Sequence, residues 1–149
     1  MASRTAVLLV ALAALAGCDN SGSAVSADVL EACVRTRTAT ERVFRTAGEW
    51  EAFLAANDGS APAVDFPASM VAVHLEGPGS ACVGYSVDSV EEAGREIVVR
   101  ATRHESPGAC IAVVAYPGLV VSLRTGPESV RFEIGRVRDE PPTRSSPCV

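Results

Sequence analysis

Between residues 70 and 134, hydrophobic residues recur at every second position in short runs separated by turn residues. This alternation places apolar side chains on one face of a β-strand. The residues expected to face the core are, in chain order, Val71, Val73 and Leu75; Val83, Tyr85 and Val87; Ile97, Val99 and Ala101; Ile111, Val113 and Ala115; residues 119–123; and Val130, Phe132 and Ile134.

Residues typical of turns separate these strands. They cluster at 77–80, 91–94, 104–108 and 125–127, and glycine occurs in each cluster. Glycine, proline and small polar residues readily adopt the backbone conformations that tight turns require. Short alternating strands joined by brief turns favour an antiparallel sheet that packs one face against a core and exposes the other to solvent.

A helical pattern precedes these strands. Thr46, followed three residues later by Glu49, matches a capping box. Trp50 and the apolar residues three and four positions after it form one stripe, which predicts a helix over 46–57 with the tryptophan in the core. The segment 34–45 is rich in β-branched residues and favours a strand.

These elements predict an α+β fold: a mostly antiparallel β-sheet, curled or sandwich-like, with one short helix packed on it. We expect this domain to span residues 29–135. The small polar residues 18–28 bury too little apolar surface to order themselves and predict a flexible tether. Residues 136–149, rich in arginine, proline and serine, are expected to form a C-terminal tail.

The start of the chain has the features of an export signal. Arg4 precedes an apolar run over 6–16 that is shorter than the roughly 20 residues of a membrane-spanning helix. The following Leu-Ala-Gly-Cys sequence, ending at Cys18, resembles a bacterial lipobox, which implies a lipoprotein signal peptide over 1–17 and acylation of Cys18. We expect an envelope protein anchored to the inner or outer membrane and facing the periplasm or the exterior. An ordinary secretory signal with a chance cysteine is the alternative.

The charge of the chain disfavours nucleic acid as a partner. All 13 basic residues are arginines, and 18 aspartates and glutamates give a net charge of −5. Nucleic-acid binding draws most of its affinity from basic patches, which an acidic chain lacks overall. The same charge gives no attraction to anionic lipid, so membrane attachment must come from the acyl chains on Cys18.

Four cysteines remain after the lipobox: Cys33, Cys82, Cys110 and Cys148. Exported proteins meet an oxidising compartment, so we expect two disulfides. The spacings match no paired-cysteine metal motif, and we expect neither a metal nor a cofactor.

The strand pattern favours one pairing of these cysteines. Cys82 and Cys110 each follow a glycine-containing turn, and a simple meander puts these two turns at the same end of the sheet. This geometry favours Cys82–Cys110, with Cys33–Cys148 joining the two ends of the domain. One observation opposes a Cys82–Cys110 bond. The strand predicted at 95–103 would lie between these two cysteines and separate them by about 2 × 4.8 Å, whereas a disulfide needs Cα atoms within about 7 Å. Cys33–Cys110 with Cys82–Cys148 stays open as the second solution.

We find no sequence motif for catalysis. The chain lacks a nucleophile elbow, a zinc-protease motif, a phosphate loop and a dinucleotide-binding motif. Of its two histidines, His74 falls inside a predicted strand, and His104 falls in a predicted turn beside Glu105 and Ser106. Catalytic triads meet through the fold and rarely through adjacent positions, so we expect no catalytic residue.

Several short motifs together resemble a known family. They are Trp50, Asp65-Phe66-Pro67 with residues 70–73, Gly84-Tyr85-Ser86-Val87, residues 97–99, and Tyr116-Pro117 with residues 120–121. The set resembles the C-terminal domain of PrcB, a lipoprotein associated with the dentilisin-type protease complex of oral spirochaetes, over roughly residues 46–134. The resemblance implies a small mixed β domain on a lipid anchor that stabilises a partner without catalysing a reaction.

The functional expectation is therefore a non-enzymatic, lipid-anchored envelope domain that binds or stabilises a protein partner, such as a protease complex. Two other classes stay open. One is a protease inhibitor that presents a turn such as 104–109, and the other is a secreted hydrolase with an unrecognised site. A histidine, a carboxylate and a hydroxyl that converge in one cleft would favour the hydrolase.

Overall fold

Ten strands and one helix make up the part of the chain that the computed structural model describes, residues 22–107, 113–126, 128–138 and 148. In chain order they are β1 (Ser23–Ala24), β2 (Ala27–Val29), β3 (Thr40–Phe44), α1 (Ala47–Ala56), β4 (Ser69–Leu75), β5 (Gly79–Ser80), β6 (Val83–Ala93), β7 (Glu96–Glu105), β8 (Val114–Ala115), β9 (Gly118–Arg124) and β10 (Ser129–Arg138). The prediction of a mostly β, mostly antiparallel α+β domain with one short helix is confirmed.

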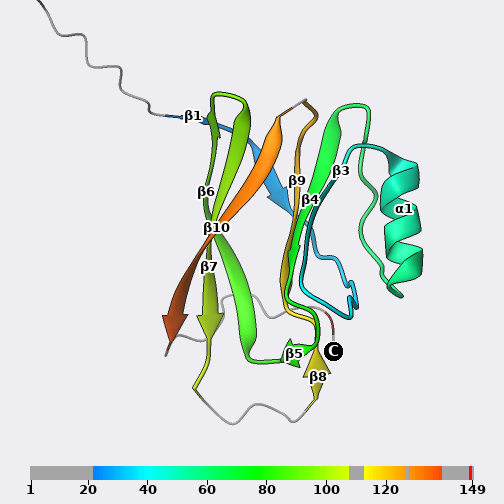
Figure 1. Ribbon diagram of the computed structural model, residues 1–149, viewed down its shortest axis with the longest axis vertical. Coiled ribbons are helices and arrows are strands. Elements are labelled where there is room, and N and C mark those ends of the chain that lie inside the picture. The colour runs from blue at the N-terminus through cyan, green and yellow to red at the C-terminus, as the bar shows by residue number, and fades with distance from the viewer. Residues whose placement is uncertain (1–21, 108–112, 127, 139–147, 149) are drawn as a thin grey trace, which may run out of the picture.

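The strands form two four-stranded sheets and one small ladder. The first sheet has the order β1-β6-β7-β10 and is called the β6 sheet below. The second has the order β2-β9-β4-β3 and is called the β4 sheet, while β5 and β8 pair separately. Figure 1 shows the two sheets facing each other, with α1 on the far side of the β4 sheet.

Alternate residues of the strands fill the space between the sheets. The β4 sheet contributes Met70 and Ala72, and the β6 sheet contributes Ile97 and Val99 among others. The opposite face of β4, with Val71 and its alternate neighbours, packs in a second cluster beneath α1. The alternation along β4 is therefore as predicted, but the expectation of a solvent-exposed second face is wrong for this strand, because the helix covers it.

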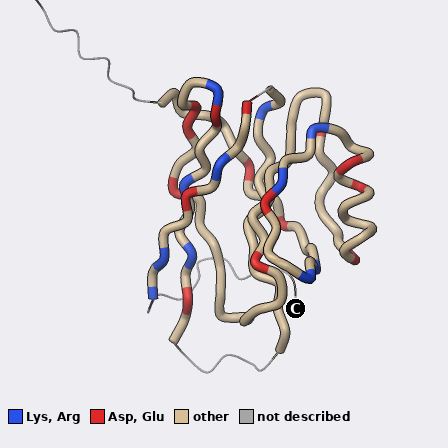
Figure 2. Tube along the Cα trace, in the orientation of Figure 1, with Lys and Arg blue, Asp and Glu red and all other residues tan. Residues whose placement is uncertain are grey.

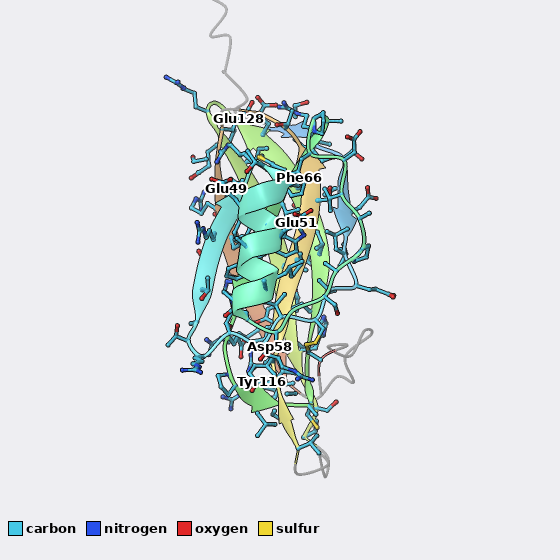
Figure 3. The ribbon with its side chains drawn as sticks, turned by 90° about the vertical axis from the view of Figure 1, so that its right-hand side faces the viewer. Glu49, Glu51, Asp58, Phe66, Tyr116 and Glu128 are labelled. Carbon is cyan, nitrogen blue, oxygen red and sulfur yellow. A yellow bond between two sulfur atoms is a disulfide. The ribbon has the colours of Figure 1, made fainter. Side chains whose placement is uncertain are left out.

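The helix begins and packs as its sequence predicts. Thr46 is the N-cap, and its hydroxyl accepts a hydrogen bond from the Glu49 backbone N–H at 3.3 Å. Trp50 is buried, with its ring centroid 5.1 Å from that of Phe44 in β3. These rings and Phe53 join α1 to the β4 sheet, and Figure 3 shows the helix lying along this sheet.

The strand order is not a simple meander. β4 pairs with β3 and β9 and not with β6, the next long strand along the chain. β10 pairs with β7 in parallel, from Ser129 opposite Glu96 to Arg138 opposite Glu105. A parallel neighbour requires a long crossover, and here the chain passes through β8 and β9 before it returns. The meander assumed for the cysteine pairing is therefore wrong.

Part of the segment predicted as a flexible tether, residues 18–28, belongs to the folded domain. Residues 22–28 of it lie within the described structure, where β1 pairs with β6 and β2 pairs with β9. A Cβ at Gly22 would lie 2.8 Å from the carbonyl oxygen of Glu92, so glycine allows this close approach. The prediction of a flexible segment through Asp28 is wrong over these residues, because β1 and β2 pair through their backbones and Val25 and Ala27 pack against the core between the sheets. The signal peptide and Cys18 lie outside the described residues.

At the other end of the domain, β10 runs to Arg138 and so extends into the segment predicted as a tail. Cys33 and Cys148 form a disulfide with Cα atoms 4.9 Å apart. Cys148 is buried, and its carbonyl accepts a hydrogen bond from the Tyr116 backbone N–H at 3.4 Å. The labelled Tyr116 marks this end of the domain in Figure 3.

The Cys33–Cys148 pairing is confirmed, and the alternative that joined Cys33 to Cys110 is wrong. Cys82 is also disulfide-bonded. Because Cys110 lies outside the described residues, the pairing of Cys82 with Cys110 stays a prediction.

Candidate functional site

A groove of about 470 Å³ lies between β3 and β10. These are edge strands: within the described residues, β3 pairs only with β4, and β10 pairs only with β7. The groove is lined by Glu41, Arg42, Val43, Arg45, Ser129, Val130 and Phe132. The groove therefore runs along the side of the domain where β3 and β10 are the edge strands of their two sheets.

The floor of the groove is apolar and its rim is charged. Val43 from the β4 sheet and Val130 and Phe132 from the β6 sheet are partly buried and pack against the core between the sheets. Arg42 on the rim is exposed, and its guanidinium carbon lies 5.0 Å from the centroid of the Phe44 ring. An apolar floor with charged groups above it is typical of surfaces that bind protein segments.

Arg45 joins the two sides of the groove at one end through hydrogen bonds. Its Nε donates to the carbonyl of Gly126 at 3.2 Å, and one terminal nitrogen donates to the carbonyl of Glu128 at 2.6 Å. These bonds join the residue after β3 to the turn that leads into β10. The two walls of the groove are thus held together by a side chain that satisfies two backbone carbonyls at once.

A polar network begins at the groove and continues inward. Oε1 of Glu41 on the rim lies 2.6 Å from Nδ1 of His74 in β4. The His74 ring is 5.6 Å from the Phe132 ring in the groove floor and 5.7 Å from the Tyr85 ring, centroid to centroid. The His74 ring therefore contacts both the Phe132 ring in the groove floor and the Tyr85 ring.

Glu76 is the centre of this network. It accepts a hydrogen bond from the Tyr85 hydroxyl and two from Arg103, from Nε at 2.5 Å and from a terminal nitrogen at 3.2 Å. Arg103 also donates to Glu105 at 3.0 Å. The fork from Arg103 to Glu76 fixes both side chains, since two parallel bonds define the orientation of each plane.

The surroundings keep these groups in their ordinary charge states. Burial raises the pKa of Glu76, but the hydrogen bonds from Arg103 and Tyr85 outweigh it and hold the pKa below its usual value. Burial and the bond to Glu76 raise the pKa of Tyr85, and the bond to Glu76 raises that of Arg103. All three shifts lead away from neutral pH, so this trio is suited to holding structure and not to proton transfer.

Replacing Glu76 by glutamine is expected to destabilise the domain in a pH-dependent way. Only 28% of the Glu76 side chain and 16% of the Arg103 side chain are exposed. At pH 7 we expect a loss of about 1–3 kcal/mol of unfolding free energy. Because the folded-state pKa is lowered, the carboxylate stabilises above its ordinary pKa of 4.5, and this contribution disappears as the pH falls through the folded value.

Urea unfolding at pH 7 and at pH 3 measures this difference. The difference in unfolding free energy between the wild type and Glu76→Gln is expected to be smaller at pH 3 than at pH 7. The control is Glu96→Gln, whose partner Arg131 is exposed, and which is expected to change stability by less than about 0.5 kcal/mol. An equal difference in unfolding free energy at the two pH values would contradict the role given to the Glu76 carboxylate.

The histidine expected in a turn lies instead in β7. His104 is buried, and its Nε2 is 2.8 Å from the hydroxyl oxygen of Ser86 in the neighbouring strand. Of its sequence neighbours, the Glu105 carboxylate accepts a hydrogen bond from Arg103, and the Ser106 backbone N–H donates to the carbonyl of Cys82. The Ser–His pair could not be recognised from the sequence because its members lie on two strands, although both occupy the alternate positions that face away from the core.

The same face of the β6 sheet carries exposed ion pairs. Arg100 bonds Glu91 at 2.7 Å and Glu133 at 2.8 Å, and Arg131 bonds Glu96 at 3.0 Å. Figure 2 shows basic and acidic positions interspersed along these strands. Exposed pairs of this kind contribute little stability individually, and they balance positive and negative charge on this face.

Within the described residues, no group of three or more potential metal ligands is found, and no helix is long and apolar enough to cross a membrane. The turn proposed for a protease inhibitor is divided: its first residues belong to β7, and residues 108 and 109 lie outside the described structure.

Comparisons of the chain with protein-family models, with curated proteins and with solved structures find no match. The resemblance to PrcB therefore stays a prediction. Function has to be inferred from the groove and its surroundings.

Proposed function

We propose that this chain is a lipid-anchored cell-envelope protein whose domain binds or stabilises another protein through the groove between β3 and β10. The observation that carries the proposal is the groove itself, an apolar floor enclosed by two edge strands. The sandwich-like stacking of the two sheets is part of the proposal, because it holds the two edges at a fixed separation.

The chemistry of the groove supports binding more than catalysis. An edge strand presents unpaired backbone N–H and C=O groups, to which an extended segment of another protein can bond. The floor residues Val43, Val130 and Phe132 offer apolar contacts to alternate side chains of such a segment. The Glu76–Arg103 fork joins the end of β4 to β7 and offers no group that exchanges protons near neutral pH.

Affinity capture from detergent-solubilised membranes tests this function. Wild-type protein is expected to enrich one specific partner, and Arg42→Glu, on the rim of the groove, is expected to lose it. Glu51→Arg is the control, since Glu51 is exposed on the helix at the far side of the β4 sheet. Equal enrichment by both variants, or no specific partner, would contradict the proposal.

The lipid anchor belongs to the same proposal. Cys18→Ser is expected to block acylation and to leave protein that is either uncleaved or released from the membrane. Several acyl chains hold a protein firmly on a bilayer, whereas one chain binds it marginally. Fractionation followed by a carbonate wash measures this. Normal processing together with full membrane retention of Cys18→Ser would rule out the lipoprotein assignment.

A second candidate function rests on the Ser86–His104 hydrogen bond. A serine hydroxyl within hydrogen-bond reach of a histidine is the arrangement that activates a nucleophile in hydrolases. The test is turnover of activated esters by the wild type and by Ser86→Ala. Turnover that disappears in the variant would support hydrolysis, and equal turnover in both would end this candidate.

A further inference from the structure

We propose that one end of the domain rests on the lipid headgroups of the membrane, held there by the short connection to Cys18, and that one end of the groove therefore lies beside the bilayer. This end consists of residues 92–96, 124–126, 128 and 129 and is called the entry end below. The placement rests on the lipid anchor of the proposed function and adds which surface of the domain meets the bilayer.

The chain enters the fold at this end. β1 pairs with β6 in antiparallel orientation, with Ser23 opposite Glu92, next to the turn into β7. β1 therefore starts at the end of the β6 sheet and runs inward along the strand axis (Figure 1). Val25 then packs against the core, and its backbone N–H donates to the carbonyl of Val90 at 2.9 Å. The fold thus holds the chain from its entry point onward.

The connection from this point to the proposed anchor is short. Cys18 precedes Gly22, the first described residue, by four positions. A chain spans at most about 3.3–3.6 Å per residue, so these two residues lie at most about 14 Å apart. The headgroup layer of one leaflet is itself about 5–8 Å thick. Acyl chains on Cys18 therefore keep Gly22 within about 9 Å of the headgroup surface.

This distance is small compared with the domain. β6 alone has eleven residues and extends for about 36 Å, so the far end of the sheet lies well beyond the reach of the connection. The domain can tilt about Gly22, but the entry end is the surface that the connection keeps at the bilayer. Because β1 enters along the strand axis, the strands are expected to point away from the membrane.

The entry end has a surface that suits polar headgroups. Its three described carboxylates are each paired with an arginine: Glu92 and Glu128 with Arg124, at 2.5 and 3.3 Å, and Glu96 with Arg131, at 3.0 Å. Arg95, in the turn between β6 and β7, is exposed, and a guanidinium is a good donor to lipid phosphate. This end is therefore not repelled by an anionic leaflet, although the chain as a whole is acidic.

Insertion into the hydrocarbon is not expected at this end. The large hydrophobic side chains that are exposed among the described residues are Val29, Val113 and Val114. Val29 lies opposite Val121 in the middle of β9, and Val114 belongs to the small ladder at the far end (Figure 1). Contact of the entry end with the membrane is therefore polar, and the acyl chains supply the apolar part of the attachment.

The same placement brings the groove to the membrane. Ser129, the first residue of β10, lines the groove and belongs to the entry end. Arg45 closes the groove on this side through its bonds to the carbonyls of Gly126 and Glu128. Figure 3 shows Glu128 at one end of the domain and Tyr116 at the other. A partner segment that fills the groove therefore reaches the membrane-proximal end of the domain.

Nuclear magnetic resonance of the mature chain in phosphatidylcholine nanodiscs tests this placement. A small share of the lipid carries a Gd³⁺ chelate on its headgroup, which broadens the signals of nearby backbone amides. Mass spectrometry first verifies the acyl chains on Cys18. The signals of residues 92–96 and 124–126 are expected to be lost, whereas those of residues 57–60 and 77–80, at the far end, are expected to persist.

A variant with a longer connection is the matched control. Inserting about 20 Gly/Ser residues between Asn20 and Ser21 leaves the described domain unchanged and raises the average reach of the connection to about 27 Å. The signals of residues 92–96 are expected to recover in this variant. Thermal unfolding checks that the domain keeps its stability.

Equal broadening at the two ends of the acylated wild-type chain, or stronger broadening at residues 57–60 and 77–80, would overturn the placement. Broadening of residues 92–96 that is undiminished by the longer connection would also overturn it, because the short connection would not be what holds this end. These results would leave the lipid anchor and partner binding intact. Absence of acyl chains on Cys18 would contradict the lipid anchor itself, and the placement with it.

Discussion

Replacing Cys148 by serine is expected to lower the free energy of unfolding by about 4–5 kcal/mol. The disulfide joins residues 115 positions apart, so it closes almost the whole domain into one loop. In the chain-entropy account, a cross-link over roughly 100 residues removes denatured-state freedom worth about 4.7 kcal/mol. The buried position of Cys148 adds to the loss, because an unpaired serine hydroxyl there is poorly solvated.

Urea unfolding of Cys33→Ser, Cys148→Ser and the double variant measures this effect. The three variants are expected to lose similar amounts, since each removes the same bond. If the loss of unfolding free energy in the double variant equals the sum of the two single losses, each cysteine stabilises the domain independently of the disulfide. A loss below about 1 kcal/mol in either single variant would contradict the role of the cross-link.

The second large effect is expected from Phe44→Ala. Phe44 is fully buried at the end of β3, with its ring 5.1 Å from Trp50 and 4.7 Å from Phe53, centroid to centroid. Truncating a buried phenylalanine typically costs about 3–5 kcal/mol, through the lost apolar contact and the cavity that remains. Because Phe44 joins β3 to α1, the loss is also expected to loosen one wall of the groove.

Chemical denaturation with the matched variant Val114→Ala separates core from surface. Val114 is 59% exposed, so its truncation is expected to cost less than about 0.5 kcal/mol. Hydrogen exchange along β3 should accelerate in Phe44→Ala more than exchange along β7. A cost below about 1 kcal/mol, or uniform acceleration, would contradict the role given to Phe44 in fixing the edge strand.

Local structure could be predicted from the sequence where the signal is itself local. The Thr46 cap, the burial of Trp50 and the alternation along β4 depend on neighbouring residues and were predicted correctly. The neighbours of β4 could not be predicted, because alternation assigns side chains to faces and carries no information on which strand lies alongside. The parallel pairing of β10 with β7 was missed for the same reason.

The candidate site is harder to predict, because it forms between distant segments. Val43 and Phe132 meet across the groove only after the chain has made both sheets, and neither belongs to a motif. The Cys33–Cys148 pairing was predicted correctly although the meander behind it was wrong, since joining the two ends of a domain does not depend on strand order.

Site-specific photocrosslinking in living cells tests the central claim, that the groove is where a partner binds. A photoreactive phenylalanine derivative replaces Arg42 on the groove rim in one variant and Glu51 on the exposed side of α1 in another, both in the full lipidated chain. We expect one discrete cross-linked protein from position 42 and none from position 51. The same product from both positions, or a product from position 51 alone, would contradict it.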